Sequence, residues 1–333
     1  MSTTATQLAA DPRAQRIFDA LQEPRRRDLL SRVRRYRMSR SRRAMIGAGD
    51  PAVRFVLDGS ELLIPLSHML PQIRRNYPDY SRNVGRIAAR VFRAHPDGCM
   101  IDVGANIGDT VAIVRAAGVR APIVCVEGEP GFLRVLEANL AGPLGRDVAL
   151  ERCFAGEAEG EIAGAVKTTQ GTASIIGAGS GPAIRVRTVD AIAAANARGA
   201  VRLLKVDTDG FDAKVIRGSA AVIARDHPAI FLEYDPDFMS RAGDDGRDVL
   251  RSLARAGYGP VLAYDNHGRY LLHAEAANEA LWNDLHAYYV GRAGAAYMDL
   301  CALHASDGAI ADAIVREELA INCRPRDAAE HAR

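Results

Sequence analysis

The spacing of hydrophobic positions changes along this chain of 333 residues. Apolar residues recur at helical spacing over residues 12–44, and the pattern over residues 79–94 predicts a further helix. Between them, residues 52–65 alternate apolar and polar positions around a glycine turn, which predicts a β-hairpin. We therefore expect an N-terminal region, residues 1–95, that is helical with one hairpin and supplies lid, substrate or oligomer contacts.

From residue 98 onward, short apolar runs alternate with helical segments, which predicts an α/β fold with a doubly wound, mostly parallel sheet. The strand-like runs lie at residues 99–104, 122–128, 148–156, 201–210 and 229–236. Two more runs within residues 260–272 flank a polar turn and predict an antiparallel hairpin that closes the sheet. The expected core spans residues 96–274, and residues 275–333 are expected to form a mainly helical extension.

Composition is that of a globular protein, with 48% hydrophobic residues, but the charge is unevenly distributed. The net charge is only +2, whereas residues 1–50 contain 12 Arg against 5 acidic residues. The run "RRRDLLSRVRRYRMSRSRR" (25–43) fits either a site for phosphate, RNA or an anionic surface, or a solvated amphipathic helix. We favour the second interpretation, in which the apolar side chains face inward; these are Leu29, Leu30, Val33 and Tyr36.

Cysteine and targeting patterns point to a reducing compartment. The five cysteines include no pair or cluster with zinc spacing, so free thiols and no metal site are expected. The N-terminus lacks the apolar segment of a secretory signal, and no apolar run approaches the ~20 residues of a membrane helix. We expect a soluble, cytoplasmic protein, and a homo-oligomer stays possible.

The first strand-like run leads into "IDVGANIGDT" (101–110), which contains Asp102, Gly104, Asn106, Gly108 and Asp109. Ligands of open α/β sheets bind beyond the carboxyl ends of such strands. The order D-x-G-x-N-x-G differs from the G-x-G-x-x-G that places a pyrophosphate at a helix N-terminus. S-adenosylmethionine carries no phosphate and needs close backbone approach, which the two glycines permit, and polar partners, which Asp102 and Asn106 provide.

Three further residues are candidates for the nucleoside half of this cofactor. Glu127 ends the second strand-like run, "IVCVE", where a carboxylate can accept both ribose hydroxyls, although enzymes that bind NAD share this feature. Phe154 and Glu157 follow the third run and are candidates to stack on and hydrogen-bond adenine. Core packing and a turn are the structural alternatives for these two residues.

Several of these stretches together resemble one family. "IDVGANIGDT", "VCVEGEPGFLRVLEANL", "RVRTVDAI", "LLKVDTDGFDAKVIRGS" and "FLEYDP", with "LLIPLSHMLPQIRRNYPDYSRNVGRIA" upstream and "YMDLCALHASD" downstream, closely resemble FkbM-type methyltransferases over about residues 60–310. The resemblance implies the class I methyltransferase fold, a Rossmann-like doubly wound sheet with a closing antiparallel hairpin. It also implies S-adenosylmethionine as donor and O-methylation of a hydroxyl, often on a sugar, in glycan biosynthesis. Asp209 in "DTDG" stands where many members carry a longer glutamate.

Methyl transfer to a hydroxyl needs the acceptor oxygen held in line with the methyl group, and a positioned base assists it. Lys205, Asp207 and Asp209 alternate along the fourth strand-like run and share one orientation if the strand extends to residue 209. We place Asp207 first and Asp209 second, as base or as anchor of the acceptor hydroxyl. The alternatives are a helix cap after Gly210 for the aspartates and an ion pair for Lys205.

Other acceptor-side candidates come from separate parts of the chain. Glu233 ends the strand-like run "IFLEY" and could bind acceptor hydroxyls, or Mg²⁺ shared with Asp207 as a less favoured alternative. His68 in "PLSHML" is a candidate base carried by the N-terminal region, with a purely structural role as the alternative. The Gly-rich stretch 169–179, with Thr172 and Ser174, is expected to be a mobile loop that either closes over the acceptor or is only a surface excursion.

These observations favour an S-adenosylmethionine-dependent O-methyltransferase acting on a sugar, a glycan or a glycosylated small molecule. The first alternative is a nicotinamide oxidoreductase, which the glycine spacing disfavours. The second is a non-catalytic protein that binds nucleic acid through its basic N-terminus. No specific nucleic-acid partner is expected, because aromatic residues are scarce in the basic run.

Overall fold

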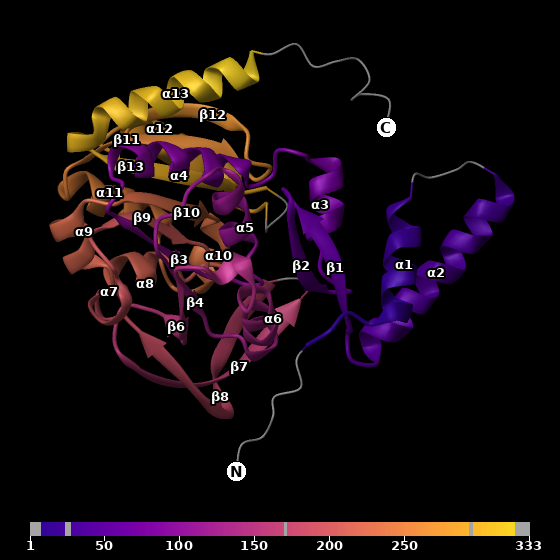
Figure 1. Cartoon of the computed structure of the whole chain (residues 1–333). Helices are drawn as coiled ribbons and strands as arrows, with labels where there is room; N and C mark the ends of the chain where they lie inside the picture. Colours follow the sequence, from indigo (N-terminus) through magenta and orange to yellow (C-terminus); the bar gives the residue numbers. More distant parts are fainter. Residues whose placement is uncertain (1–7, 24–27, 170–171, 293–295, 324–333) are drawn as a thin grey trace.

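An eight-stranded sheet, in the order β12-β11-β13-β10-β9-β3-β4-β5, forms the centre of the molecule (Figure 1). The computed structural model describes residues 8–23, 28–169, 172–292 and 296–323, with only the backbone for 162–183. Five neighbouring strands run parallel and confirm the predicted doubly wound α/β sheet. They are β3 (Cys99–Val103), β4 (Ile123–Glu127), β5 (Val148–Arg152), β9 (Val201–Val206) and β10 (Ala229–Tyr234).

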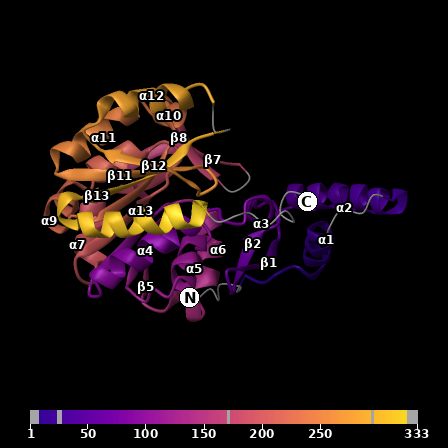
Figure 2. The same ribbon diagram turned by 90° about the horizontal axis from the view of Figure 1, so that it is seen from above.

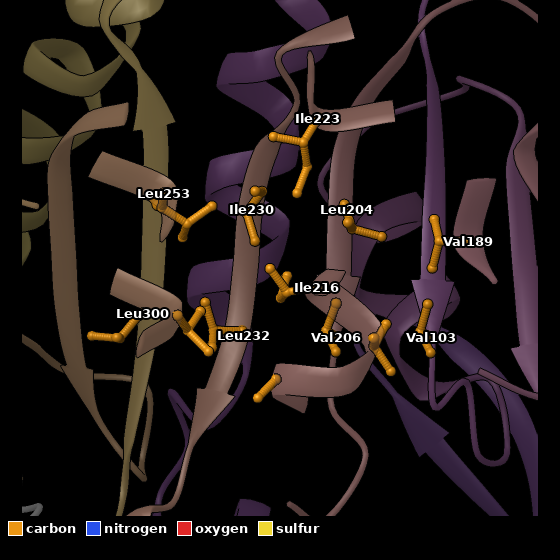
Figure 3. Packing of buried hydrophobic residues seen from close by; sticks show 14 of the residues in the cluster. Val103, Val189, Leu204, Val206, Ile216, Ile223, Ile230, Leu232, Leu253 and Leu300 are labelled. Carbon is orange, nitrogen blue, oxygen red and sulfur yellow. The ribbon is translucent and has the colours of Figure 1, made fainter. Parts of the chain in front are cut away.

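Helices cover both faces of this sheet, so its central strands are buried on two sides and consist of nearly continuous apolar runs. One face is covered by α7 (Val189–Asn196), α8 (Asp212–Arg217), α9 (Ala220–Asp226), α10 (Pro236–Arg241), α11 (Gly246–Arg255) and α12 (Glu279–Tyr289). The other is covered by α4 (Arg82–Ala94), α5 (Asp109–Ala116), α6 (Pro130–Leu140) and α13 (Gly308–Asn322). Figure 3 shows side chains of adjacent strands and covering helices packed in the first of these layers.

The closing part of the sheet was only partly predicted. The hairpin is present as β11 (Tyr258–Asp265) and β12 (Tyr270–Glu275). However, β13 (Met298–His304) lies between β10 and β11 and runs antiparallel to both. The prediction of a mainly helical extension over residues 275–333 is therefore wrong at this strand, whose Leu300 packs in the central core (Figure 3). A short apolar run fits a helix or a strand equally well, and the tertiary partner decides.

The N-terminal region packs against the core through a third hydrophobic cluster. The predicted hairpin is confirmed as β1 (Ala52–Leu57) and β2 (Ser60–Pro65). The hairpin packs against α5 and α6, and α1 (Pro12–Gln22) packs against β1. A short helix that was not predicted, α3 (Leu70–Asn76), leads into α4.

Helix α2 (Leu29–Gly47) pairs with α1 to form an arm that projects from the body of the molecule (Figures 1 and 2). The prediction that its apolar side chains face inward is wrong. Leu29, Leu30, Val33 and Tyr36 are 72%, 82%, 49% and 63% exposed. Helical spacing reveals that a row of apolar residues exists, but it does not reveal on which side a packing partner lies.

A small sheet beside the core, in the order β6-β8-β7, consists of β6 (Phe154–Ala155), β7 (Gly160–Thr169) and β8 (Thr172–Arg187). The expected loop over residues 169–179 lies largely within this β7–β8 pair. The prediction of a loop there is therefore wrong for its described residues.

Candidate functional site

A pocket opens at the carboxyl ends of β3, β4, β9 and β10. Its walls come from three separate parts of the chain: residues 68–84 of the N-terminal region, the loops after these strands, and residues 297–299 at the start of β13. The sequence places polar residues after each strand, and the parallel sheet brings these ends to one edge.

The glycine loop after β3 is shaped by the neighbouring strand. Gly104 has φ +77°, and a Cβ there would lie 1.9 Å from the carbonyl oxygen of Asp207. Gly104 lines the pocket and was predicted to let a ligand approach the backbone closely. The Asp207 carbonyl, directly after β9, already leaves no room for a Cβ at this position, so glycine is required even without a ligand. Gly108 (φ +87°) precedes α5 and lies outside the pocket lining, where a Cβ would approach Leu136 to 2.9 Å.

Glu127, at the end of β4, lines the pocket and also fixes the glycine loop. Its carboxylate accepts hydrogen bonds from the backbone N–H groups of Asn106 (2.8 Å), Gly128 (2.9 Å) and Glu129 (2.8 Å). Burial raises the pKa of Glu127 to about 7, although these three bonds act in the opposite direction. The carboxyl group of this pocket residue therefore has a pKa near neutral pH.

Asp102, Lys205 and Asp207 form a chain of charges across two strands. The Lys205 ammonium lies 3.2 Å from an oxygen of each aspartate. Burial alone would lower the pKa of Lys205, but the nearby Asp102, Asp207 and Asp109 carboxylates outweigh it and raise that pKa well above its usual value. Burial also raises the pKa of Asp102 to about 6, and Lys205 opposes the rise.

The two aspartates of this chain differ in access to the pocket. Asp102 is fully buried and does not line the pocket, so its predicted contact with the cofactor is not supported. Asp207 lines the pocket with a side chain that is 47% exposed. The predicted alternative for Lys205, an ion pair, is confirmed.

The chain turns sharply after β9, and the expected extension to residue 209 is wrong. The strand ends at Val206, and Asp209 adopts the left-handed conformation with φ +49° while still lining the pocket. No side chain caps α8, so neither Asp207 nor Asp209 acts as its cap. Instead, Asp212 accepts the N–H groups of Thr208 and Gly210 at 3.2 and 3.1 Å and holds the turn.

Glu233 and Asp299 occupy paired positions on the neighbouring strands β10 and β13, and both line the pocket. Burial raises the pKa of each well above its usual value, and the Asp207 carboxylate adds to the rise. Burial and the neighbouring carboxylates thus favour the protonated form of each group, and a protonated carboxyl group can donate as well as accept hydrogen bonds. Tyr80 and Tyr297 complete this side of the pocket.

Sequence reasoning missed Asp299, Tyr297 and Tyr80. Asp299 lies in β13 and Tyr297 directly precedes it, in a region that was expected to be mainly helical. Their signal was the alternation of polar and buried positions in "YMDL", which is typical of a strand.

The remaining predicted residues divide between the pocket and the surface. Phe154, Asp109 and His68 line the pocket, and the Phe154 ring lies where a Cβ on Gly128 would be, only 2.2 Å away. Burial lowers the pKa of His68, opposed by the Asp109 charge, and so favours the neutral imidazole. Glu157 lies outside the lining and pairs with Arg217 at 2.6 Å on the surface, so the prediction that it contacts adenine is not supported.

Charge and shape of the pocket suit S-adenosylmethionine. Its described lining contains one lysine, Lys205, and six acidic residues, which are Asp109, Glu127, Asp207, Asp209, Glu233 and Asp299. A sulfonium cation is favoured in such surroundings, whereas a pyrophosphate is repelled. No cluster of His, Cys, Asp or Glu that could hold a metal occurs among the described residues. Within that same part of the chain, no helix has the length and apolarity to cross a bilayer.

Comparison with known families identifies the core. The family model described as Methyltransferase FkbM domain matches residues 102–260, from β3 to the start of β11. The core of the chain therefore matches an FkbM methyltransferase domain. This confirms the predicted family and agrees with S-adenosylmethionine as the cofactor. The FkbM domain as matched ends before β13, so Tyr297 and Asp299 lie outside it, as does the N-terminal wall of the pocket.

Solved structures show weaker likenesses to the chain. A methyltransferase FkbM from Methylobacillus flagellatus is 18% identical, with a TM-score of 0.36 over 50% of this chain and 40% of that chain. The precorrin-6y C5,15-methyltransferase of Geobacter metallireducens is 12% identical, with a TM-score of 0.34 over 65% of this chain and 87% of that chain. No curated protein matches the sequence. At these scores the likenesses carry no weight in the assignment, which stands on the family model.

Proposed function

We propose that this FkbM methyltransferase transfers the methyl group of S-adenosylmethionine to a hydroxyl of a sugar, a glycan or a glycosylated small molecule. The observation that carries the proposal is the carboxyl-rich pocket at the strand ends, continuous from Glu127 to Glu233 and Asp299. The bound donor would supply a methyl group on a sulfonium, which is already an activated leaving group. The chain then has to hold the donor, align the acceptor oxygen and receive its proton.

Two parts of the pocket divide these tasks in the proposal. Glu127 would accept hydrogen bonds from the ribose hydroxyls, and the Phe154 ring, next to Gly128, would provide a flat surface for adenine. The Asn106 backbone stays in place because Glu127 holds it. Asp109 and the start of α5, which line the same pocket, would face the methionine half of the donor.

Asp207 is the proposed base or anchor of the acceptor hydroxyl, because of the two aspartates paired with Lys205 it is the one whose side chain is exposed in the pocket. Asp209 follows it on the turn, and Glu233 with Asp299 forms the far wall. Carboxyl groups accept hydrogen bonds from sugar hydroxyls, and in the protonated form they also donate to them. The same surroundings disfavour a phosphate at the reacting end of the acceptor, so that end is expected to be neutral or cationic.

The nicotinamide alternative receives no support from this pocket. A dinucleotide needs donors and positive charge for two phosphates. The pocket offers instead the excess of carboxylates described above, with Lys205 engaged by two aspartates.

The test is mass spectrometry of the surface polysaccharide and secreted glycosides of the host with and without the gene. The expected result is loss of one methyl group from a sugar in the strain without the gene, restored by the wild-type gene but not by Asp207→Asn. Unchanged glycans in a strain whose protein pool loses a methyl mark would contradict sugar O-methylation.

A further inference from the structure

The outer face of the α1–α2 arm has no role in the pocket, yet it combines exposed apolar residues with a dense row of arginines. Leu29, Val33 and Tyr36 are spaced i, i+4 and i+7, so they lie along one side of α2, with Leu30 beside them. All four are about half or more exposed, the largest being Leu30 at 82%. The two most exposed large apolar side chains of the described residues, Leu30 and Leu29, thus lie in one row with two others on a single helix.

Arginines surround this apolar row. Helix α2 contains seven arginines and no acidic residue. Five of them are exposed, and none of the five makes an ion pair with any residue that the structure describes. They are Arg32, Arg34, Arg37, Arg40 and Arg43.

The opposite side of α2 is used to attach the arm to the body. Arg35 donates to the carbonyl of Leu21 at 2.9 Å, and Arg42 donates to the carbonyl of Leu66 at 2.8 Å. Met45 packs against the N-terminal hydrophobic cluster. These contacts fix which side of the helix faces outward, and the arm projects clear of the sheet and its helices (Figures 1 and 2).

We propose that the outer face of α2 docks on the surface of a lipid bilayer that contains anionic lipids. A helix of this kind lies in the plane of the membrane, with its apolar side inserted about 5–10 Å and its arginines at the lipid headgroups. Leu29, Leu30 and Val33 enter the acyl boundary, and Tyr36 suits the interface, where an aromatic ring with a polar tip is favoured. The arginines are attracted by the negative surface potential of anionic lipids.

Other occupants match only part of this face. A nucleic acid would neutralise the arginines but leave the leucine row in water. A second copy of the arm, related by two-fold symmetry, would cover the leucines but bring arginines against arginines. An anionic bilayer satisfies both features at once.

The experiment is flotation of the full-length protein with vesicles. Phosphatidylcholine vesicles are compared with vesicles of phosphatidylcholine and phosphatidylglycerol in equal amounts, over a series of salt concentrations. Binding is expected only to the anionic vesicles and is expected to weaken as salt screens the arginines. Binding to both kinds alike, or to neither, overturns the proposal.

Two variants separate charge from insertion. Arg32→Gln/Arg40→Gln/Arg43→Gln is expected to weaken binding roughly a hundredfold, at about fivefold per arginine. Leu29→Gln/Val33→Gln is expected to weaken it at least tenfold, because the inserted apolar area is lost. The matched control is Arg316→Gln/Leu319→Gln on α13, which removes an exposed arginine and an apolar side chain that is 46% exposed; it should bind as the wild type does.

All of these positions are exposed, so the variants are expected to unfold at the wild-type temperature, which is measured first. Single-stranded RNA and sedimentation velocity test the other occupants. RNA binding in place of vesicle binding overturns the proposal. So does a dimer that Leu29→Gln/Val33→Gln dissociates.

Discussion

Burial of Glu127 makes the affinity for the cofactor depend on pH in a direction that the structure fixes. Burial raises the pKa of Glu127 to about 7, whereas an exposed glutamate titrates near 4.5. Ribose hydroxyls donate to the ionised carboxylate more strongly than to the neutral acid. Binding therefore releases a proton from part of the population, and affinity rises as pH increases through 7.

The size of the effect follows from the fraction of Glu127 that is ionised. With a pKa of about 7, this fraction is about one in eleven at pH 6 and about ten in eleven at pH 8. The dissociation constant of S-adenosylhomocysteine should therefore fall about tenfold between these values and level off above pH 8. Isothermal titration calorimetry in buffers of different ionisation enthalpy measures both the affinity and the released proton.

Glu127→Gln supplies the decisive variant, because glutamine keeps the size of the side chain but never ionises. Its NH2 group also replaces one of the two oxygens that accept backbone N–H groups, which adds to the loss of affinity but not to its dependence on pH. It should weaken binding at pH 8 by about 10–100-fold, the value of charge-assisted hydrogen bonds, and remove the dependence on pH. Asp212→Asn is the matched control, since burial raises the pKa of Asp212 also to about 7, yet its carboxylate holds the turn after β9 outside the pocket lining. A slope that survives in Glu127→Gln, or an affinity that falls as pH rises, would refute the reasoning.

Three further variants test the site and its supports. Asp207→Asn should lower the turnover rate about 10²–10⁴-fold with little change in S-adenosylhomocysteine affinity, and an unchanged rate would remove it as base. Gly104→Ala should lower the free energy of unfolding in urea by about 3 kcal/mol or more, because of its positive φ and the Asp207 carbonyl; a stable variant would contradict that geometry. Arg86→Met should lower the free energy of unfolding by about 3–5 kcal/mol, because it leaves the buried Glu318 without its ion-pair partner. Arg90→Met, whose pair with Glu317 is more exposed, should lower it by about 1 kcal/mol or less, and equal losses would contradict the burial argument.

Much of the fold could be predicted because strand-like and helical segments alternate and are separated by glycine and polar residues that mark turns. The end of β4 at Glu127 and the turn of β1–β2 were visible as an apolar run before a carboxylate and as alternation around a glycine. Placement of β13 was not visible, since a seven-residue run carries no information on which strands it joins. Asp299 was missed with it, and the wall it forms depends on pairing with Glu233 across a gap of more than sixty residues in the chain.

The orientation of side chains was the other quantity that the sequence left open. Asp102 and Asp207 both looked suited to a ligand, yet only the exposed Asp207 lines the pocket. Spacing in α2 likewise revealed the apolar row at Leu29 and Val33, but its direction depends on the contacts of Arg42 with a distant carbonyl. Pattern identifies which residues share a face, and packing decides what that face meets.

The central claim is that the carboxyl-rich rim around Glu127 holds a sulfonium nucleoside and not a dinucleotide. Parallel calorimetric titrations of the full-length protein with S-adenosylhomocysteine and with NADH test it most directly. The account predicts saturable one-to-one binding of S-adenosylhomocysteine and no heat with NADH. Binding of NADH without binding of S-adenosylhomocysteine would contradict it.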